Sequence, residues 1–102
     1  MEITKDLQGT ELTMKISGRI DTSTSIQLNK EVKGSLEGVT KLVFDVDDVD
    51  YISSAGLRVF VAADNIMQQQ QGSLTIINAS EELMDIFNVT GFAKFMDIKT
   101  KA

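Results

Sequence analysis

The chain has 102 residues and a net charge of −5 at pH 7, with no cysteine and no histidine. This length is enough for one hydrophobic core, so we expect a single domain over residues 1–102. The negative charge and the scattered basic residues argue against nucleic-acid binding. The N-terminus has no signal-peptide pattern, and no apolar run approaches the roughly 20 residues of a membrane helix. We therefore expect a cytoplasmic protein with no nucleic-acid or membrane partner.

The first third of the chain predicts a β-hairpin followed by a helix. Polar and apolar residues alternate over 11–17, which is typical of a half-buried strand, and residues 2–7 can pair with it across a turn. The residues from Asp21 to Thr24 are all of the types that cap helix N-termini. Apolar residues then recur every four positions and predict a helix over about 23–36.

The rest of the chain alternates strands and helices. Residues 41–46 are apolar on both faces, which indicates a strand covered on both sides. Ser53 and Ser54 can cap a long helix that runs to about residue 70, and Gly72 is expected to stop it. The remaining predicted elements are a strand over 74–77, a short helix from Ser80 and a strand over 95–98. This order predicts an α/β fold with a mixed, mostly parallel sheet.

Four aspartates lie around the end of the predicted central strand, before the following helix: Asp45, Asp47, Asp48 and Asp50. In open α/β sheets, functional sites gather at this end of the strands. The calcium-loop spacing fails, because Val49 and Asp50 occupy the positions that need an acid and a glycine. A looser Mg²⁺ site on Asp45 and Asp47 is possible, but we favour solvated acids and expect no metal or cofactor.

The two serines at the start of the long helix are the second candidate site. A nucleophilic serine needs an adjacent base, normally histidine, and the chain has none, so we expect no enzyme. Considered without a family, Ser53 and Ser54 are most simply N-caps. A phosphate would nevertheless be tolerated there, because helix N-terminal amides and the helix dipole favour an anion. It would add a charge of about −1.5 to −2 close to the aspartates and change the surface without unfolding the domain.

The helix that follows Ser54 is apolar nearly all round in its first half, from Leu57 to Ala63, and only Arg58 interrupts it. Such a helix is either deeply packed or partly offered to a partner. Packing is the usual answer, but part of this surface should lie beside Ser54 and could form an interface.

Four segments carry a resemblance to a known family: residues 18–21, 42–46, 49–57 and 88–92. In order and spacing they resemble the STAS domain of bacterial anti-sigma factor antagonists. The resemblance implies a mixed, mostly parallel sheet of four to five strands flanked by three to four helices. It also implies a non-enzymatic partner switch in transcription regulation and stress response. The unphosphorylated domain binds an anti-sigma factor serine kinase, which frees the sigma factor. The kinase then phosphorylates the domain, and a metal-dependent serine phosphatase restores it.

The resemblance also assigns the site. Ser54 matches the phosphorylated serine, because it precedes a small residue and then Gly56-Leu57, and Ser53 is the alternate. Asp21 matches an acid that helps partner binding. The full set of expected partner-binding residues is Asp21, Asp48, Ser53, Ser54, Gly56, Leu57 and Arg58. Two alternatives stay open: a phosphorylation-independent scaffold subunit of a sensory complex, and an enzyme or small-ligand carrier.

Overall fold

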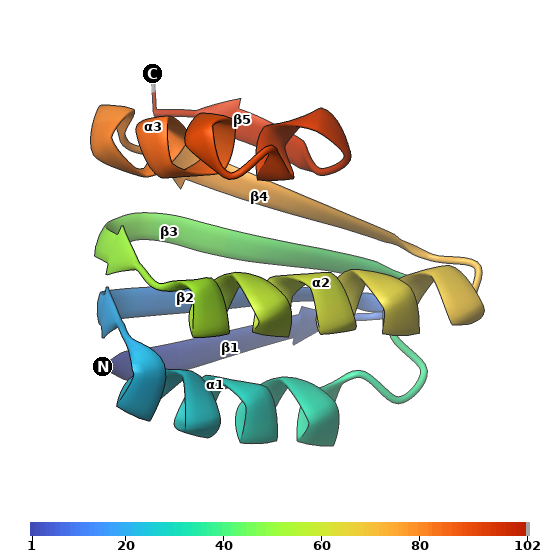
Figure 1. Ribbon diagram of the computed structural model, residues 1–102. Coiled ribbons are helices and arrows are strands. Elements are labelled where there is room, and N and C mark those ends of the chain that lie inside the picture. Colours follow the sequence, from blue (N-terminus) through green and yellow to red (C-terminus); the bar gives the residue numbers. More distant parts are fainter. Residues whose placement is uncertain (102) are drawn as a thin grey trace.

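The computed structural model describes residues 1–101, which form one five-stranded sheet in the order β1-β2-β3-β4-β5 (Figure 1). The β1 and β2 strands pair antiparallel, and all later neighbours pair parallel. The prediction of a mixed, mostly parallel sheet is confirmed. The strands are β1 (Glu2–Gln8), β2 (Glu11–Ile20), β3 (Lys41–Ile52), β4 (Ser73–Ala79) and β5 (Asp97–Thr100). The helices are α1 (Thr22–Ser35), α2 (Ser54–Gln69), α3 (Glu81–Val89) and the short 3₁₀ segment η1 (Phe92–Lys94).

All three α-helices lie over the same face of the sheet (Figure 1). Side chains of β2 alternate accordingly: Leu12, Met14 and Ile16 are buried beneath the helices, whereas Lys15 on the opposite face is exposed. Period-two alternation of this kind is the pattern of a sheet with one covered face and one solvated face. None of the helices formed by residues 1–101 has both the length and the apolar character that a membrane span requires.

The expectation that residues 41–46 form a strand covered on both sides is therefore wrong. Leu42 and Phe44 point into the core, but Val43 points to the face without helices and is still only 8% exposed. Its neighbours in the register are Thr13 on β2 and Thr75 on β4. Side chains on the two adjacent strands can thus bury a small apolar residue without a second helical layer.

The central strand is also longer than predicted. β3 continues through the aspartate-rich segment to Ile52, because its second half pairs with the end of β2. The register shifts twice: Lys15 and Ser17 face Asp45 and Asp48, so β3 carries an extra residue there, and a second extra residue follows Val49. Such bulges interrupt the alternation of side chains, which is why the sequence pattern suggested a loop.

Two further boundaries differ from the predictions. The last strand begins at Asp97, since Phe92–Lys94 forms η1 and the chain turns after it. The residue with left-handed backbone after α2 is Gln71, with φ of 59°, and not Gly72 as the expected helix stop would suggest. Gly72 instead lets two backbones approach: an added Cβ would lie 2.5 Å from the carbonyl oxygen of Thr40. The absent side chain at this position is thus a packing requirement.

Candidate functional site

The N-termini of α1 and α2 meet at one end of the sheet (Figure 1). Ile20 and Ile52, the last residues of β2 and β3, are partners in the parallel register. The amide of Ser53 extends this pairing and donates to the carbonyl of Ile20 at 2.8 Å. Asp21 and Ser53, which directly follow the two strands, are the N-caps of α1 and α2. The strand register thus brings together two residues that are 32 positions apart in the chain.

Asp21 is tightly bonded to the first turn of α1. Its Oδ1 accepts from the amides of Ser23 and Thr24 at 3.0 and 2.9 Å. The hydroxyl of Thr24 accepts in return from the Asp21 amide at 2.8 Å, which completes a capping box. The hydrogen bond from the Thr24 amide, followed by that from the Ser23 hydroxyl, holds the pKa of the Asp21 carboxyl below its usual value. Arg19 approaches the same carboxylate at 4.0 Å and lies over the Tyr51 ring, 4.1 Å from its centroid.

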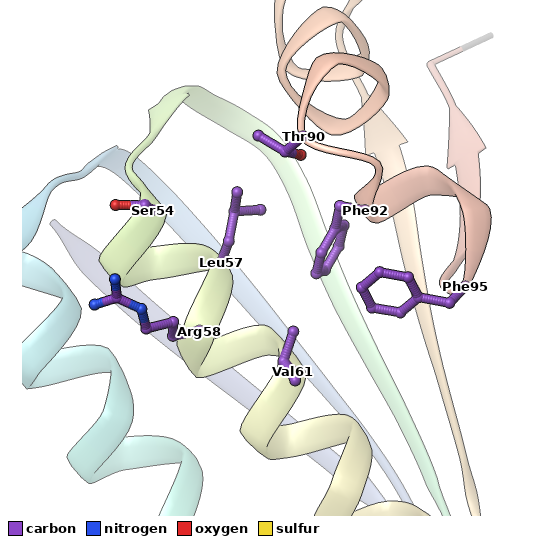
Figure 2. A pocket seen from close by; sticks show the side chains of 7 residues that line it. All are labelled: Ser54, Leu57, Arg58, Val61, Thr90, Phe92 and Phe95. Atoms are coloured by element: carbon purple, nitrogen blue, oxygen red, sulfur yellow. The ribbon is translucent and has the colours of Figure 1, made fainter.

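The two adjacent serines have different surroundings. Ser53 is buried, with 9% of its surface exposed, and its hydroxyl oxygen accepts from the amide of Gly56 at 3.2 Å. Ser54, the first residue of α2, is exposed. Within residues 1–101 its hydroxyl forms no hydrogen bond, and Figure 2 shows it directed away from Leu57 and Phe92. Ser53 therefore has a structural function as the N-cap, while the Ser54 hydroxyl is available at the surface.

Gly56 fixes the position of this helix start. A Cβ at Gly56 would lie 2.6 Å from Ile20 Cγ2 and 2.7 Å from Ile52 Cγ1. Because both isoleucines end strands, the first turn of α2 rests directly on the end of the sheet. The neighbouring Leu57 is buried and contributes to the core.

A mainly apolar hollow of about 350 Å³ opens beside Ser54, between α2 and the segment around η1 (Figure 2). In Figure 2, Leu57 and Val61 point from α2 toward Phe92 and Phe95. Phe95 is 62% exposed. The lining residues are Ser54, Leu57, Arg58, Val61, Thr90, Phe92 and Phe95.

A second, smaller hollow of about 260 Å³ lies between α1 and α2. Ile26, on α1, lines it and is 71% exposed. Arg58 lines both hollows. The other residues around the second hollow are Ser25, Asn29 and Val59.

The four aspartates of β3 do not lie together with Ser54 in either hollow. Asp48 forms an ion pair with Lys15 at 3.6 Å, and Asp47 forms one with Lys101 at 3.0 Å. Asp45 accepts from the side-chain amide of Asn78 at 3.0 Å. The part of the chain that the structure describes contains no group of three or more potential metal ligands. Of the expected partner-binding residues, only Asp48 lies within a strand, on the stretch of β3 that pairs with Ser17, and the others lie at the start of a helix.

Sequence reasoning missed three residues of the larger hollow: Thr90, Phe92 and Phe95. Thr90 and Phe92 belong to a segment that contributed to the family resemblance, but their types suggested no chemistry. Phe95 was assigned to the last strand. The sequence carried no signal for its exposure, which follows from the turn after η1.

The fold and the site define a small α/β domain, with helices on one face, that presents a free serine next to an apolar hollow. Residues 2–102 match the STAS domain. The chain is 33% identical over 104 residues to the anti-sigma-B factor antagonist of Bacillus subtilis, covering 100% of this chain and 95% of the relative. It is 34% identical over 86 residues to the anti-sigma-B factor antagonist of Listeria monocytogenes, covering 82% and 75%. The chain therefore belongs to the STAS domain family of bacterial anti-sigma factor antagonists.

Solved structures have the same fold. The anti-sigma factor antagonist from Mycobacterium paratuberculosis superposes with a TM-score of 0.85 at 18% identity, covering 96% of this chain and 84% of that one. The unphosphorylated form of the anti-sigma factor antagonist SpoIIAA gives a TM-score of 0.83 at 14% identity, covering 98% and 90%. At these identities the likeness concerns the fold.

Proposed function

We propose that this chain is an anti-sigma factor antagonist that works as a phosphorylation-gated partner switch. In its unmodified state it binds an anti-sigma factor serine kinase in the cytoplasm, and the sigma factor is released. The kinase transfers the γ-phosphoryl group of ATP to the hydroxyl of Ser54, with loss of the hydroxyl proton, and the complex dissociates. A metal-dependent serine phosphatase hydrolyses the phosphoester and restores the binding state. The chain itself performs no catalysis.

The observation that carries this proposal is the difference between the two serines. A kinase must reach the hydroxyl that it modifies, and Ser54 is exposed at the first position of α2. Ser53 is buried and its oxygen already accepts from Gly56. A phosphate on Ser53 would have to break the N-cap and enter a packed site, whereas one on Ser54 would face solvent near the free amides of the helix start.

The partner surface that we propose is centred on the start of α2. It includes the exposed residues Ser54 and Arg58 together with Asp21, while Ser53, Gly56 and Leu57 hold the first turn of α2 in place. The apolar hollow between Leu57 and Phe95 contributes apolar surface to this contact, since buried apolar surface is the main attractive contribution in most interfaces. Asp48 would belong to this surface only at its margin.

A phosphate would act on this surface by its charge. The phosphorylated form of SpoIIAA, a protein of the same fold, gives a TM-score of 0.74 to this chain, which supports the proposal that a phosphate leaves the fold intact. The loss of one to three charge-assisted contacts, or an equal gain in repulsion, is worth a few kcal/mol, or roughly 100-fold in affinity. We expected nearby aspartates to add to the repulsion, but Asp47 and Asp48 are paired with lysines elsewhere.

The test is phosphorylation by the cognate serine kinase with ATP, followed by mass spectrometry. We expect one phosphate on the parent protein and none on Ser54→Ala. Ser53→Gly is the matched control, since glycine at an N-cap costs only a few tenths of a kcal/mol relative to serine. It should be phosphorylated like the parent. Phosphorylation of Ser54→Ala to the same extent as the parent would overturn the assignment.

Affinity for the kinase separates the switch from the alternative of a phosphorylation-independent scaffold. Ser54→Ala should retain the parent affinity and Ser54→Asp should lose a large part of it. Equal affinities of the two variants would favour the scaffold.

A further inference from the structure

Arg58 is in an unusual position on the surface of α2. Of the residues that line the two hollows in the described part of the chain, it alone carries a charge. It is exposed, and within residues 1–101 its guanidinium forms no ion pair. The chain therefore presents a single free cation between two largely apolar hollows.

Arg58 is also placed to reach the hydroxyl of Ser54. The two residues are separated by four positions on α2, and side chains at this spacing are neighbours on a helix surface, about 5–6 Å apart at Cβ. Figure 2 shows the Ser54 hydroxyl and the Arg58 guanidinium on the same side of α2, toward α1, and Leu57 and Val61 on the other side. The pair also has the favourable order, with the anion toward the helix N-terminus and the cation toward the C-terminus.

We propose that Arg58 is the intramolecular partner of a phosphate on Ser54. The guanidinium is a planar fork that binds phosphate oxygens bidentately. Because phosphoserine reaches further than serine and Arg58 has no competing partner within residues 1–101, the pair forms with no change in the backbone. The phosphate then has two effects. It adds a negative charge at the start of α2, and it binds the Arg58 guanidinium, which is then no longer available in either hollow.

This withdrawal has a consequence for recognition. In the unmodified protein, Arg58 is available to an acidic group on a partner whose apolar side chains occupy the hollows. After phosphorylation, the same guanidinium is neutralised within the chain. Arg58 is thus a specificity-determining residue that distinguishes the two states, and Ser54 is the modified residue.

The inference rests on the proposed function in that Ser54 carries the phosphate, but its test needs no kinase. Phosphoserine is incorporated at position 54 during translation, and the second ionisation of the phosphate is followed by ³¹P NMR at low ionic strength. A nearby cation favours the dianion, so it lowers the second pKa of the phosphate from its ordinary value of about 6. We expect this pKa to rise by roughly 0.2–0.4 pH units in Arg58→Gln, the shift that an exposed pair at this helical spacing produces.

Two variants make the measurement specific. Arg58→Lys keeps the charge and should retain part of the lowering. Lys33→Gln removes an equal charge from the last turn of α1 and should leave the pKa unchanged. An Arg58→Gln protein with the parent pKa would overturn the inference, and so would a Lys33→Gln protein with the shift of Arg58→Gln. Failure of the kinase to modify Ser54 would instead count against the proposed function and leave this result unaffected.

Discussion

Asp21 makes the stability of the start of α1 depend on pH. Its carboxylate accepts from the amide of Thr24 and from the hydroxyl and amide of Ser23. These donors prefer the ionised form, so the pKa of Asp21 is lower in the folded protein than in the unfolded chain. The unfolded chain therefore binds the proton more readily. The stability from this carboxylate is complete above its ordinary pKa of 3.8 and is lost as the pH falls through the lowered value.

We predict that Asp21→Asn flattens the pH dependence of stability. Asparagine is a good N-cap and keeps the accepting oxygen, but it does not titrate between about pH 5 and about pH 3. Urea unfolding across this range should give a free energy of unfolding that falls less steeply than in the parent. Asp50→Asn is the control, because this exposed carboxylate forms no ion pair or hydrogen bond within residues 1–101. Parallel curves for the parent and Asp21→Asn would contradict the prediction.

At the scale of elements, the contact between α2 and the end of the sheet depends on Gly56. We predict that Gly56→Ala lowers the free energy of unfolding by about 1–3 kcal/mol, because the added methyl group overlaps Ile20 and Ile52 in a packed region. Gly34→Ala, near the end of α1, has nothing within 4 Å of the added Cβ and should raise stability by about 0.5–1 kcal/mol. Urea unfolding of both variants gives the comparison. A stable Gly56→Ala would mean that α2 can move away from the strands at little cost.

The elements also indicate which features the sequence predicts and which it does not. α1 was predicted to within one residue at each end, because capping types and four-residue spacing are local signals. The second half of β3 was not predicted, because two extra residues of β3 interrupt its pairing with β2 and the alternation of its side chains. The choice of Ser54 over Ser53 came from the family resemblance, and the residues alone suggested only an N-cap. Phe95 was missed because it reaches the hollow through a turn between η1 and β5.

At the scale of the whole molecule, one chain of aromatic rings joins the sheet to the helices over its covered face. Phe44 of β3 stacks on Phe60 of α2 with centroids 4.7 Å apart. Phe60 then approaches Phe92 at 6.2 Å, and Phe92 approaches Phe87 of α3 at 5.2 Å. The same Phe92 contacts the exposed Phe95 at 5.4 Å, so the hollow beside Ser54 is built on the edge of the core.

This continuity allows core and surface contributions to be separated by two substitutions. Phe60 is fully buried, and its replacement by alanine should cost about 3–5 kcal/mol. That loss is a large part of the roughly 5–15 kcal/mol that stabilises a typical domain. Phe95→Ala removes one edge-to-face contact of an exposed ring and should cost no more than about 1.5 kcal/mol. Chemical unfolding monitored by circular dichroism measures both. If Phe95→Ala is destabilised as much as Phe60→Ala, the ring holds η1 in place and the hollow is part of the core. If it stays folded, any loss of partner affinity can be assigned to the hollow itself.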